Sequence, residues 1–231
     1  MESVIKALNI KKSYGSLRVL GGVDFFLNNG EIAGIVGPNG CGKTTFLKIL
    51  SGIEKYDSGS LKVAGDVALI PQDNLLFPWF NIMSNIGLGL KFRGVPGKER
   101  ESKVLEISRL LGIEQYLKQY PIHISGGTAK KVAIARALVL NPDVLLLDEP
   151  FAGLDVASVE TLIESLKSLK GRISMVVVSH QIDELVEIAD RIYFFSHRPA
   201  KVTKTLDTRE LSQVESRKLV SEFLKGDRAW N

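Results

Sequence analysis

The stretch GPNGCGKTT, residues 37–45, constrains the fold more than any other part of this chain of 231 residues. The pattern G-x-x-x-x-G-K-[ST] is satisfied here by Gly37, Gly42, Lys43 and Thr44. This pattern forms a phosphate-binding loop when it lies between a buried strand and a helix. Both neighbours are predicted, because EIAGIVG before the loop is typical of a buried strand and TTFLKILSG after it is typical of a helix. The stretch therefore predicts a nucleotide site at the end of a strand in an α/β sheet.

The residue types in this loop match the chemistry of a bound triphosphate. Glycines allow the backbone to wrap a phosphate with its N–H groups, and the helix N-terminus adds a positive dipole. Lys43 would bring a positive charge to the β- and γ-phosphates, and the Thr44 hydroxyl would ligate Mg²⁺, which prefers oxygen. We therefore expect ATP to be bound by the whole loop: Gly37, Pro38, Asn39, Gly40, Cys41, Gly42, Lys43, Thr44 and Thr45.

An acidic partner for this loop follows a second buried strand, in the stretch VLLLDEP. Ligands in open α/β sheets bind at the carboxyl ends of the strands, where Asp148 and Glu149 lie. Successive strand residues point to opposite faces, so the two acids are expected to have different roles. We predict that Asp148 holds Mg²⁺, directly or through water. Glu149 is the candidate general base for the water that attacks the γ-phosphate.

Charge and cysteine content narrow the class of protein. The net charge is +4, but Lys and Arg are scattered among 26 acidic residues with no run of five or more like charges. A solvated, mildly basic surface is the better interpretation than a nucleic-acid or lipid surface. A single cysteine, Cys41, excludes an internal disulfide framework and a zinc-type cluster. No signal-type segment and no stretch near 18 apolar residues is present, so we expect any membrane role to require a partner.

The order of the elements predicts an α/β architecture with two additions. Short apolar runs within residues 4–27 are typical of antiparallel strands. The segment from Asn81 to Pro142 has a helical apolar period, and DVLLLDEP and ISMVVVSH after it are typical of parallel strands. One face of the helix between them is marked by Val159, Leu162, Ile163, Leu166 and Leu169. The tail, residues 207–225, is expected to be an amphipathic helix.

We therefore predict one domain spanning residues 1–231. Its core and β subdomain would occupy about 1–80 and 142–231, and its helical subdomain about 81–141.

A second candidate anion site opens the stretch ISGGTAKKVAIARAL. Ser125, Gly126 and Gly127 come directly before a predicted helix, where bare N–H groups and a hydroxyl would face an anion. One nucleotide does not need two separate phosphate sites within a single chain.

These motifs together resemble the ATP-binding cassette (ABC) family of nucleotide-binding subunits, over roughly residues 2–205. The resemblance implies a P-loop NTPase, RecA-like core with an N-terminal antiparallel β subdomain and an inserted helical subdomain. It also implies a head-to-tail dimer with a second copy or a homologous subunit. Each ATP would then lie between one P-loop and the partner's Ser-Gly-Gly signature. By the same resemblance, Tyr14 stacks on adenine, Gln72 contacts Mg²⁺ and water, Asp155 lies in the D-loop and His180 contacts the γ-phosphate.

The signature helix departs from the family pattern. Thr128 stands where the family often has Gln, and Lys130 and Lys131 replace the usual Gln-Arg pair. The Ser-Gly-Gly cradle itself is kept, so we expect ATP sandwiching to survive.

The segment QDNLLFPWFNIMSNIGLGL, residues 72–90, is unusually apolar for a loop and resembles bacterial importers of the nitrate, sulfonate and taurine class. In that class the segment lines the groove for the membrane subunit, which makes Phe77, Trp79 and Phe80 candidate anchors. Packing of these aromatics within the chain is the alternative. The resemblance implies multi-spanning permease partners, an extracytoplasmic solute-binding protein and a peripheral place on the cytoplasmic face of the cell membrane.

A soluble ABC-type ATPase acting on nucleic acid or the ribosome is the competing hypothesis. A DNA-repair type would carry a long coiled coil in the insert, and about 60 residues leave no room for it. A ribosome-associated type usually has two cassettes in one chain, and only one is found in this sequence. The importer hypothesis is therefore preferred, with no nucleic-acid partner, and the transported solute is not encoded in this subunit.

Overall fold

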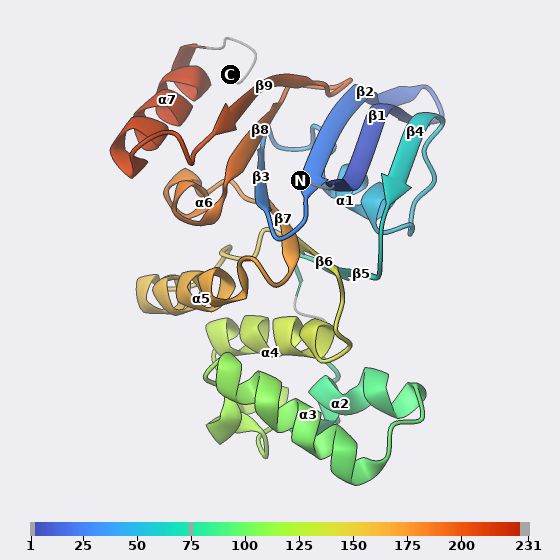
Figure 1. The fold of residues 1–231 in the computed structure, drawn as a ribbon, viewed down its shortest axis with the longest axis vertical. Coiled ribbons are helices and arrows are strands. Elements are labelled where there is room, and N and C mark those ends of the chain that lie inside the picture. The colour runs from blue at the N-terminus through green and yellow to red at the C-terminus, as the bar shows by residue number, and fades with distance from the viewer. Residues whose placement is uncertain (1–2, 74–75, 227–231) are drawn as a thin grey trace.

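A six-stranded sheet forms the centre of the molecule in the computed structural model, which describes residues 3–73 and 76–226 (Figure 1). Its strand order is β5-β6-β7-β3-β8-β9, and all neighbours are parallel except β8 and β9. The strands are β3 (Ile32–Val36), β5 (Val67–Ile70), β6 (Val144–Asp148), β7 (Ser174–Val178), β8 (Arg191–Phe195) and β9 (Val202–Asp207).

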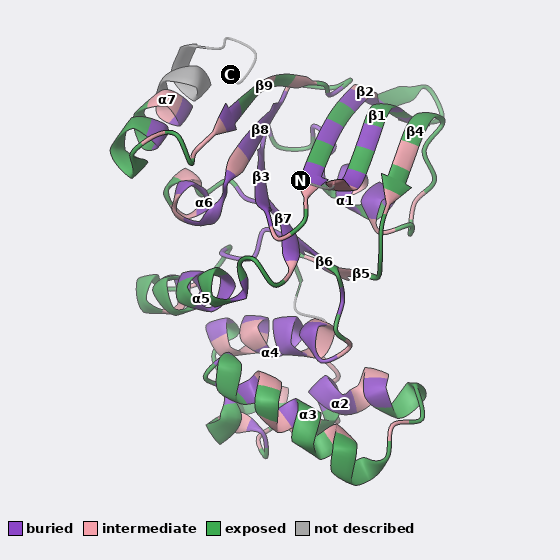
Figure 2. Ribbon diagram, in the orientation of Figure 1, coloured by how far each residue is buried: buried purple, intermediate pink, exposed green. Residues whose placement is uncertain are grey.

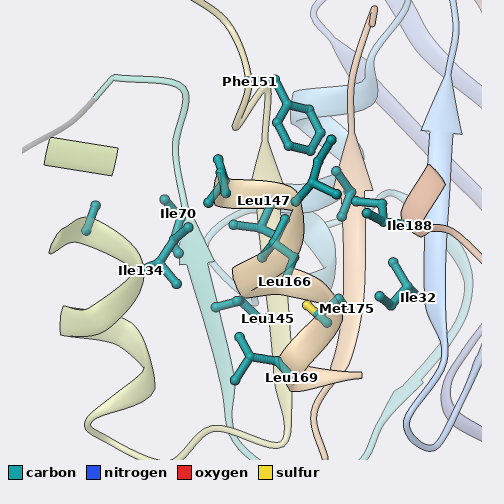
Figure 3. Packing of buried hydrophobic residues seen from close by; sticks show 14 of the residues in the cluster. Ile32, Ile70, Ile134, Leu145, Leu147, Phe151, Leu166, Leu169, Met175 and Ile188 are labelled. Carbon is teal, nitrogen blue, oxygen red and sulfur yellow. The ribbon is translucent and has the colours of Figure 1, made fainter. Parts of the chain in front are cut away.

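Both faces of this sheet are buried, which explains the continuous apolar runs in the sequence. In β6, Leu145 and Leu147 belong to one hydrophobic cluster, while Val144 and Leu146 belong to the other. The alternation follows the pleat of the strand. Figure 3 shows the first cluster, where Phe151 lies in the same apolar layer.

A three-stranded antiparallel sheet packs beside this core, in the order β2-β1-β4. It consists of β1 (Ser3–Tyr14), β2 (Leu17–Asn28) and β4 (Ser58–Val63). The buried residues of β1 include Ile5, Ala7 and Ile10, and exposed residues lie between them, so one face of the sheet covers the core. The antiparallel strands expected within residues 4–27 are confirmed as β1 and β2.

Four helices accompany the core: α1 (Lys43–Leu50), α5 (Val156–Leu169), α6 (Ile182–Ile188) and α7 (Gln213–Gly226). The apolar face expected of α5 is buried in the structure, because Val159, Leu162, Ile163, Leu166 and Leu169 are all at most 8% exposed. No helix in the described part of the chain has the length and apolar character needed to cross a membrane.

The described residues between β5 and β6 contain only helices as regular elements and form a lobe at one end of the molecule (Figure 1). The elements are α2 (Ile82–Phe92), α3 (Gly97–Leu110), α4 (Gly126–Leu138) and the short 3₁₀ helices η1 (Glu114–Tyr116) and η2 (Pro121–His123). Exposed residues dominate α3, whereas α4 is largely buried between the lobe and the core (Figure 2).

Two boundaries differ from the sequence prediction. The segment 72–90 is not a loop throughout, because α2 begins at Ile82, where the Asn81 side chain caps it by accepting from the Ser84 N–H at 2.9 Å. Residues 74–75 of that segment lie outside the described residues. The terminal helix begins at Gln213 rather than at 207, since Asp207 is the last residue of β9 and residues 208–212 form the turn between the two elements.

Candidate functional site

The loop after β3 is shaped by glycines where a side chain has no room. Gly40 and Gly42 adopt φ angles of 72° and 124°, in the region that favours glycine. A Cβ atom on Gly42 would also lie 2.7 Å from Cγ1 of Val19. Helix α1 begins at Lys43 without any side-chain cap, so its first N–H groups are left for another acceptor. The geometry fits a phosphate at this helix N-terminus.

Lys43 folds back over the loop from the first turn of α1. Its Nζ donates to the main-chain oxygens of Gly37 at 2.6 Å and Pro38 at 3.0 Å, and the residue is 6% exposed. Burial lowers the pKa of Lys43, while the nearby thiol of Cys41 and the carboxylates oppose that shift. An ammonium group has three donors, so one remains for a phosphate oxygen.

Thr44 and Asp148 meet across the sheet edge. The Thr44 hydroxyl donates to Oδ2 of Asp148 at 2.7 Å, and Asp148 is 5% exposed. A hydroxyl and a carboxylate oxygen at this separation are the hard oxygen donors that Mg²⁺ prefers. The residues present therefore fit a magnesium ion beside the loop.

Glu149 adopts a φ angle of 48°, an unusual value for a residue other than glycine. Its N–H donates to the Val178 oxygen at 2.9 Å, just beyond the end of β6. Strict strand alternation therefore does not apply between Asp148 and Glu149. Both line the same cavity, which corrects the expectation that they belong to opposite faces.

Glu149 and His180 form a close pair at this edge. The ring nitrogen Nε2 of His180 lies 3.0 Å from Oε1 of Glu149, and the main-chain N–H of His180 donates to Oε2 of Glu149 at 3.1 Å. Oε1 is nevertheless buried without a hydrogen-bond partner among the described residues. Burial raises the pKa of Glu149; burial and the charge of Lys43 lower the pKa of His180. The pair combines a carboxylate of increased basicity with a neutral imidazole.

A cavity of about 390 Å³ collects most of the predicted nucleotide-site residues. Tyr14 lies in its wall, 45% exposed, with Lys12 Nζ 4.9 Å from the centre of its ring. The lining comprises Tyr14, Leu17, Val19, Asn39, Gly40, Gly42, Lys43, Thr44, Thr45, Gln72, Asp148, Glu149, His180 and Arg198.

Three residues of that lining were not predicted from the sequence: Leu17, Val19 and Arg198. The first two belong to β2, whose place beside the loop depends on the fold. Arg198 comes from the loop between β8 and β9, outside every motif named in the sequence. Gly37, Pro38 and Cys41 belong to the phosphate loop without lining the cavity, and Cys41 is 2% exposed.

Ser125, Gly126 and Gly127 lie outside this cavity. The Ser125 hydroxyl caps α4 by accepting from the Thr128 N–H at 3.2 Å and lies 3.0 Å from the Thr128 hydroxyl. A Cβ atom on Gly126 would meet nothing within 4 Å, whereas one on Gly127 would lie 2.5 Å from Oγ of Ser158. Gly126 thus presents open backbone to the surroundings, and Gly127 allows α4 to approach α5.

Asp155 is also outside the cavity and caps α5. Its carboxylate accepts from the N–H of Ser158 at 2.9 Å and from the Ser158 hydroxyl at 2.8 Å. These hydrogen bonds lower the pKa of Asp155. Ser158 therefore connects the end of the D-loop to Gly127 of the signature.

The three aromatic residues expected at an interface lie together ahead of α2. Ring centres are 5.7 Å apart for Phe77 and Trp79 and 5.9 Å apart for Phe77 and Phe80. The buried Asn85 side chain holds this turn by accepting from the Phe77 N–H at 2.8 Å and donating to the oxygens of Phe77 and Phe80. Trp79 is 67% exposed.

Beside this turn lies an apolar cavity of about 560 Å³ between β5, α2 and α4. Phe77 lines it together with Phe92, which is 82% exposed, whereas Trp79 and Phe80 do not line it.

Comparison with known proteins identifies the relatives of this chain. The ABC transporter family profile matches residues 20–152. The chain is 36% identical to the spermidine/putrescine import ATP-binding protein PotA of Haemophilus influenzae, over 96% of this chain but 62% of that relative. It therefore spans less than two thirds of the length of that relative. It is 35% identical to the aliphatic sulfonates import ATP-binding protein SsuB of Bacillus cereus, over 93% of this chain and 92% of the relative.

Solved structures extend the likeness to three dimensions. The dimeric ATP-binding cassette MJ0796, in a post-hydrolysis state bound to ADP and Pi, superimposes with a TM-score of 0.79 at 28% identity. The alignment covers 89% of this chain and 99% of that one. The expected P-loop NTPase fold with its β and helical additions is confirmed. The family profile, the similar relatives and the shared fold together show that the chain belongs to the ABC transporter family.

Proposed function

We propose that this chain is the ATP-binding and ATP-hydrolysing subunit that powers a membrane ABC importer. The observation that carries the proposal is the single cavity in which Lys43, the Thr44–Asp148 pair and the Glu149–His180 pair converge. Nucleotide phosphates need a positive charge, an oxygen-lined metal position and a base for water, and these three groups supply them. The relatives named as import ATP-binding proteins support the direction of transport.

Each residue has a distinct task in this proposal. Lys43 and the loop N–H groups hold the β- and γ-phosphates of ATP, while Tyr14 stacks on the adenine. Thr44, Asp148 and Gln72 would hold Mg²⁺, which would neutralise charge on the phosphate oxygens. Glu149 accepts the proton of the attacking water, helped by burial that raises its pKa. His180, which lies beside Glu149, contacts the γ-phosphate and helps to position that water.

The signature residues complete the site of a second subunit. Ser125 and Gly126 are absent from the lining of the chain's own cavity, and Gly126 faces open space. A head-to-tail dimer would place them on the partner's γ-phosphate, so that hydrolysis weakens the contact between subunits. Asp155 would face the partner in the same dimer. The dimeric cassette among the similar structures supports this arrangement.

The aromatic turn and the apolar cavity between β5, α2 and α4 are the proposed docking site for a permease segment. Phe77, Trp79 and Phe80 are its anchors, because aromatic side chains dominate interface energetics. The chain would then sit peripherally on the cytoplasmic face of the membrane. An extracytoplasmic solute-binding protein would complete the system. The functional unit is one domain, with the helical subdomain at about 81–141 and the remainder of residues 1–231 as the core and β subdomain.

Hydrolysis of ATP by the purified chain tests the proposal. We expect Mg²⁺-dependent release of phosphate, reduced by a factor of about a hundred or more in Glu149→Gln, because an amide cannot accept the proton. Glu184→Gln, which changes a half-buried carboxylate on α6 outside the cavity, is the matched control and should leave the rate unchanged. Equal rates in the wild type and in Glu149→Gln would show that Glu149 is not the general base. No Mg²⁺-dependent hydrolysis by the wild type, alone or with its permease, would refute the proposed activity.

A further inference from the structure

The loop between β8 and β9 is anchored against β2. The Ala200 N–H donates to the Val19 oxygen at 2.8 Å, and the Gly21 N–H donates to the Ala200 oxygen at 2.8 Å. The loop is closed on itself by the Ser196 N–H, which donates to the Lys201 oxygen at 2.9 Å. These bonds fix the backbone on both sides of Arg198.

The side chain of Arg198 lies over the phosphate loop. A Cβ atom on Gly40 would be only 2.7 Å from one guanidinium nitrogen of Arg198, so the guanidinium packs directly against the backbone of that glycine. Arg198 lines the same cavity as Lys43. The residue is exposed, and its side chain has no hydrogen bond or ion pair within residues 3–73 and 76–226.

An ordinary solvated arginine does not explain this position. Asp148 and Glu149 line the same cavity, yet no ion pair joins either of them to Arg198. A guanidinium carries five N–H donors in a planar fork whose geometry matches phosphate oxygens in pairs. Arg198, at the rim of the phosphate loop, adds a guanidinium to the cavity that already contains the buried ammonium group of Lys43.

We propose that Arg198 is a phosphate-binding residue of the nucleotide site, contacting the polyphosphate of a nucleoside di- or triphosphate held by the loop. The inference rests on the proposed function, because it requires the cavity to hold such a nucleotide. It adds a positively charged contact from an element outside the predicted motifs. Loss of that contact should weaken the binding of nucleotides with several phosphates more than the binding of nucleotides with one.

Equilibrium binding of ATP, ADP and AMP to Arg198→Ala and Arg198→Lys tests this inference, with inorganic tripolyphosphate as a competitor. We expect Arg198→Ala to lower the affinity for ATP and ADP by about tenfold, the scale of a hydrogen bond to a charged group. The affinity for AMP should fall by clearly less. Tripolyphosphate should compete less well in the variant. Arg198→Lys, which keeps the charge but loses the fork, should fall between Arg198→Ala and the wild type.

Lys201→Ala is the matched control, because Lys201 is an exposed cation of the same loop that does not line the cavity. It should bind all three nucleotides like the wild type. Wild-type ATP affinity in Arg198→Ala would overturn the inference alone. So would an equal loss of affinity for ATP and AMP, which would mean a base or ribose contact. An equal loss in Lys201→Ala would reduce the effect to general surface charge and overturn it too. Absence of ATP binding in the wild type overturns the proposed function and, with it, this inference.

Discussion

Lys130 of α4 donates a hydrogen bond from its Nζ to the main-chain oxygen of Gln72, at 2.7 Å. Lys130 is 2% exposed, and burial lowers its pKa, against the opposing charges of Asp73 and Asp148. The bond joins the helix that begins at the signature to the loop that lines the nucleotide cavity. A residue that departs from the family pattern therefore connects the two proposed phosphate sites of one chain.

We predict that Lys130→Met raises the Mg²⁺ concentration for half-maximal hydrolysis by about tenfold, because a proposed metal contact at Gln72 loses its support. ATP binding without Mg²⁺ should stay at the wild-type level, since the phosphate loop is untouched. Lys131→Met, the same change at the next position, is the control and should leave the Mg²⁺ dependence unchanged. Identical Mg²⁺ dependence in Lys130→Met and the wild type would show that the Lys130–Gln72 hydrogen bond does not support Mg²⁺ binding.

Lys43→Ala should weaken ATP binding by about a hundredfold, because the phosphates lose a positive charge in a poorly solvated site. Lys48→Ala, an exposed lysine on the same helix, should bind ATP normally. Equilibrium titration with a fluorescent ATP analogue measures both. If a folded Lys43→Ala variant kept the wild-type affinity, the loop would not be the triphosphate site.

His180 should titrate below its ordinary value of 6.5 in the nucleotide-free chain, since burial and the Lys43 charge both disfavour the imidazolium. The imidazole is then neutral at pH 7 and becomes charged only as the pH falls through this lowered pKa. NMR titration of the histidine ring protons measures the midpoint. In Lys43→Ala the midpoint should rise, because one of the two causes is removed; no movement would exclude an effect of that charge.

Asn85→Asp should lower the free energy of unfolding by about 1–3 kcal/mol, because a carboxylate would face main-chain oxygens that now accept from the amide. The aromatic turn at residues 77–80 should loosen, and stimulation by a permease should fall while ATP affinity stays the same. Chemical denaturation gives the stability. Ser84→Ala, an exposed position on α2, serves as the reference; an equally stable Asn85→Asp would show that the turn is held by ring packing instead.

Local sequence patterns were sufficient to predict the elements whose key residues lie close together in the chain. The phosphate loop, the strand ending at Asp148 and the buried face of α5 follow from spacing and periodicity alone. The φ angle of Glu149 could not be read from an apolar run, because it arises from the hydrogen bond to Val178 in a neighbouring strand. Arg198 was missed for the same reason: its place at Gly40 depends on the pairing of its loop with β2.

In the proposed head-to-tail dimer, the signature of one subunit holds the ATP of the other. Glu149→Gln should bind ATP without turning it over, and should therefore elute from gel filtration as a dimer with ATP and Mg²⁺ and as a monomer without ATP. Adding Gly126→Asp to this variant places a carboxylate into open space, so the monomer should fold and bind ATP as before.

The decisive measurement is the mass of the double variant Gly126→Asp with Glu149→Gln, by light scattering in saturating ATP and Mg²⁺. We predict a monomer, because the added carboxylate would face the partner's triphosphate and repel it. An ATP-dependent dimer as stable as that of Glu149→Gln alone would contradict the head-to-tail account.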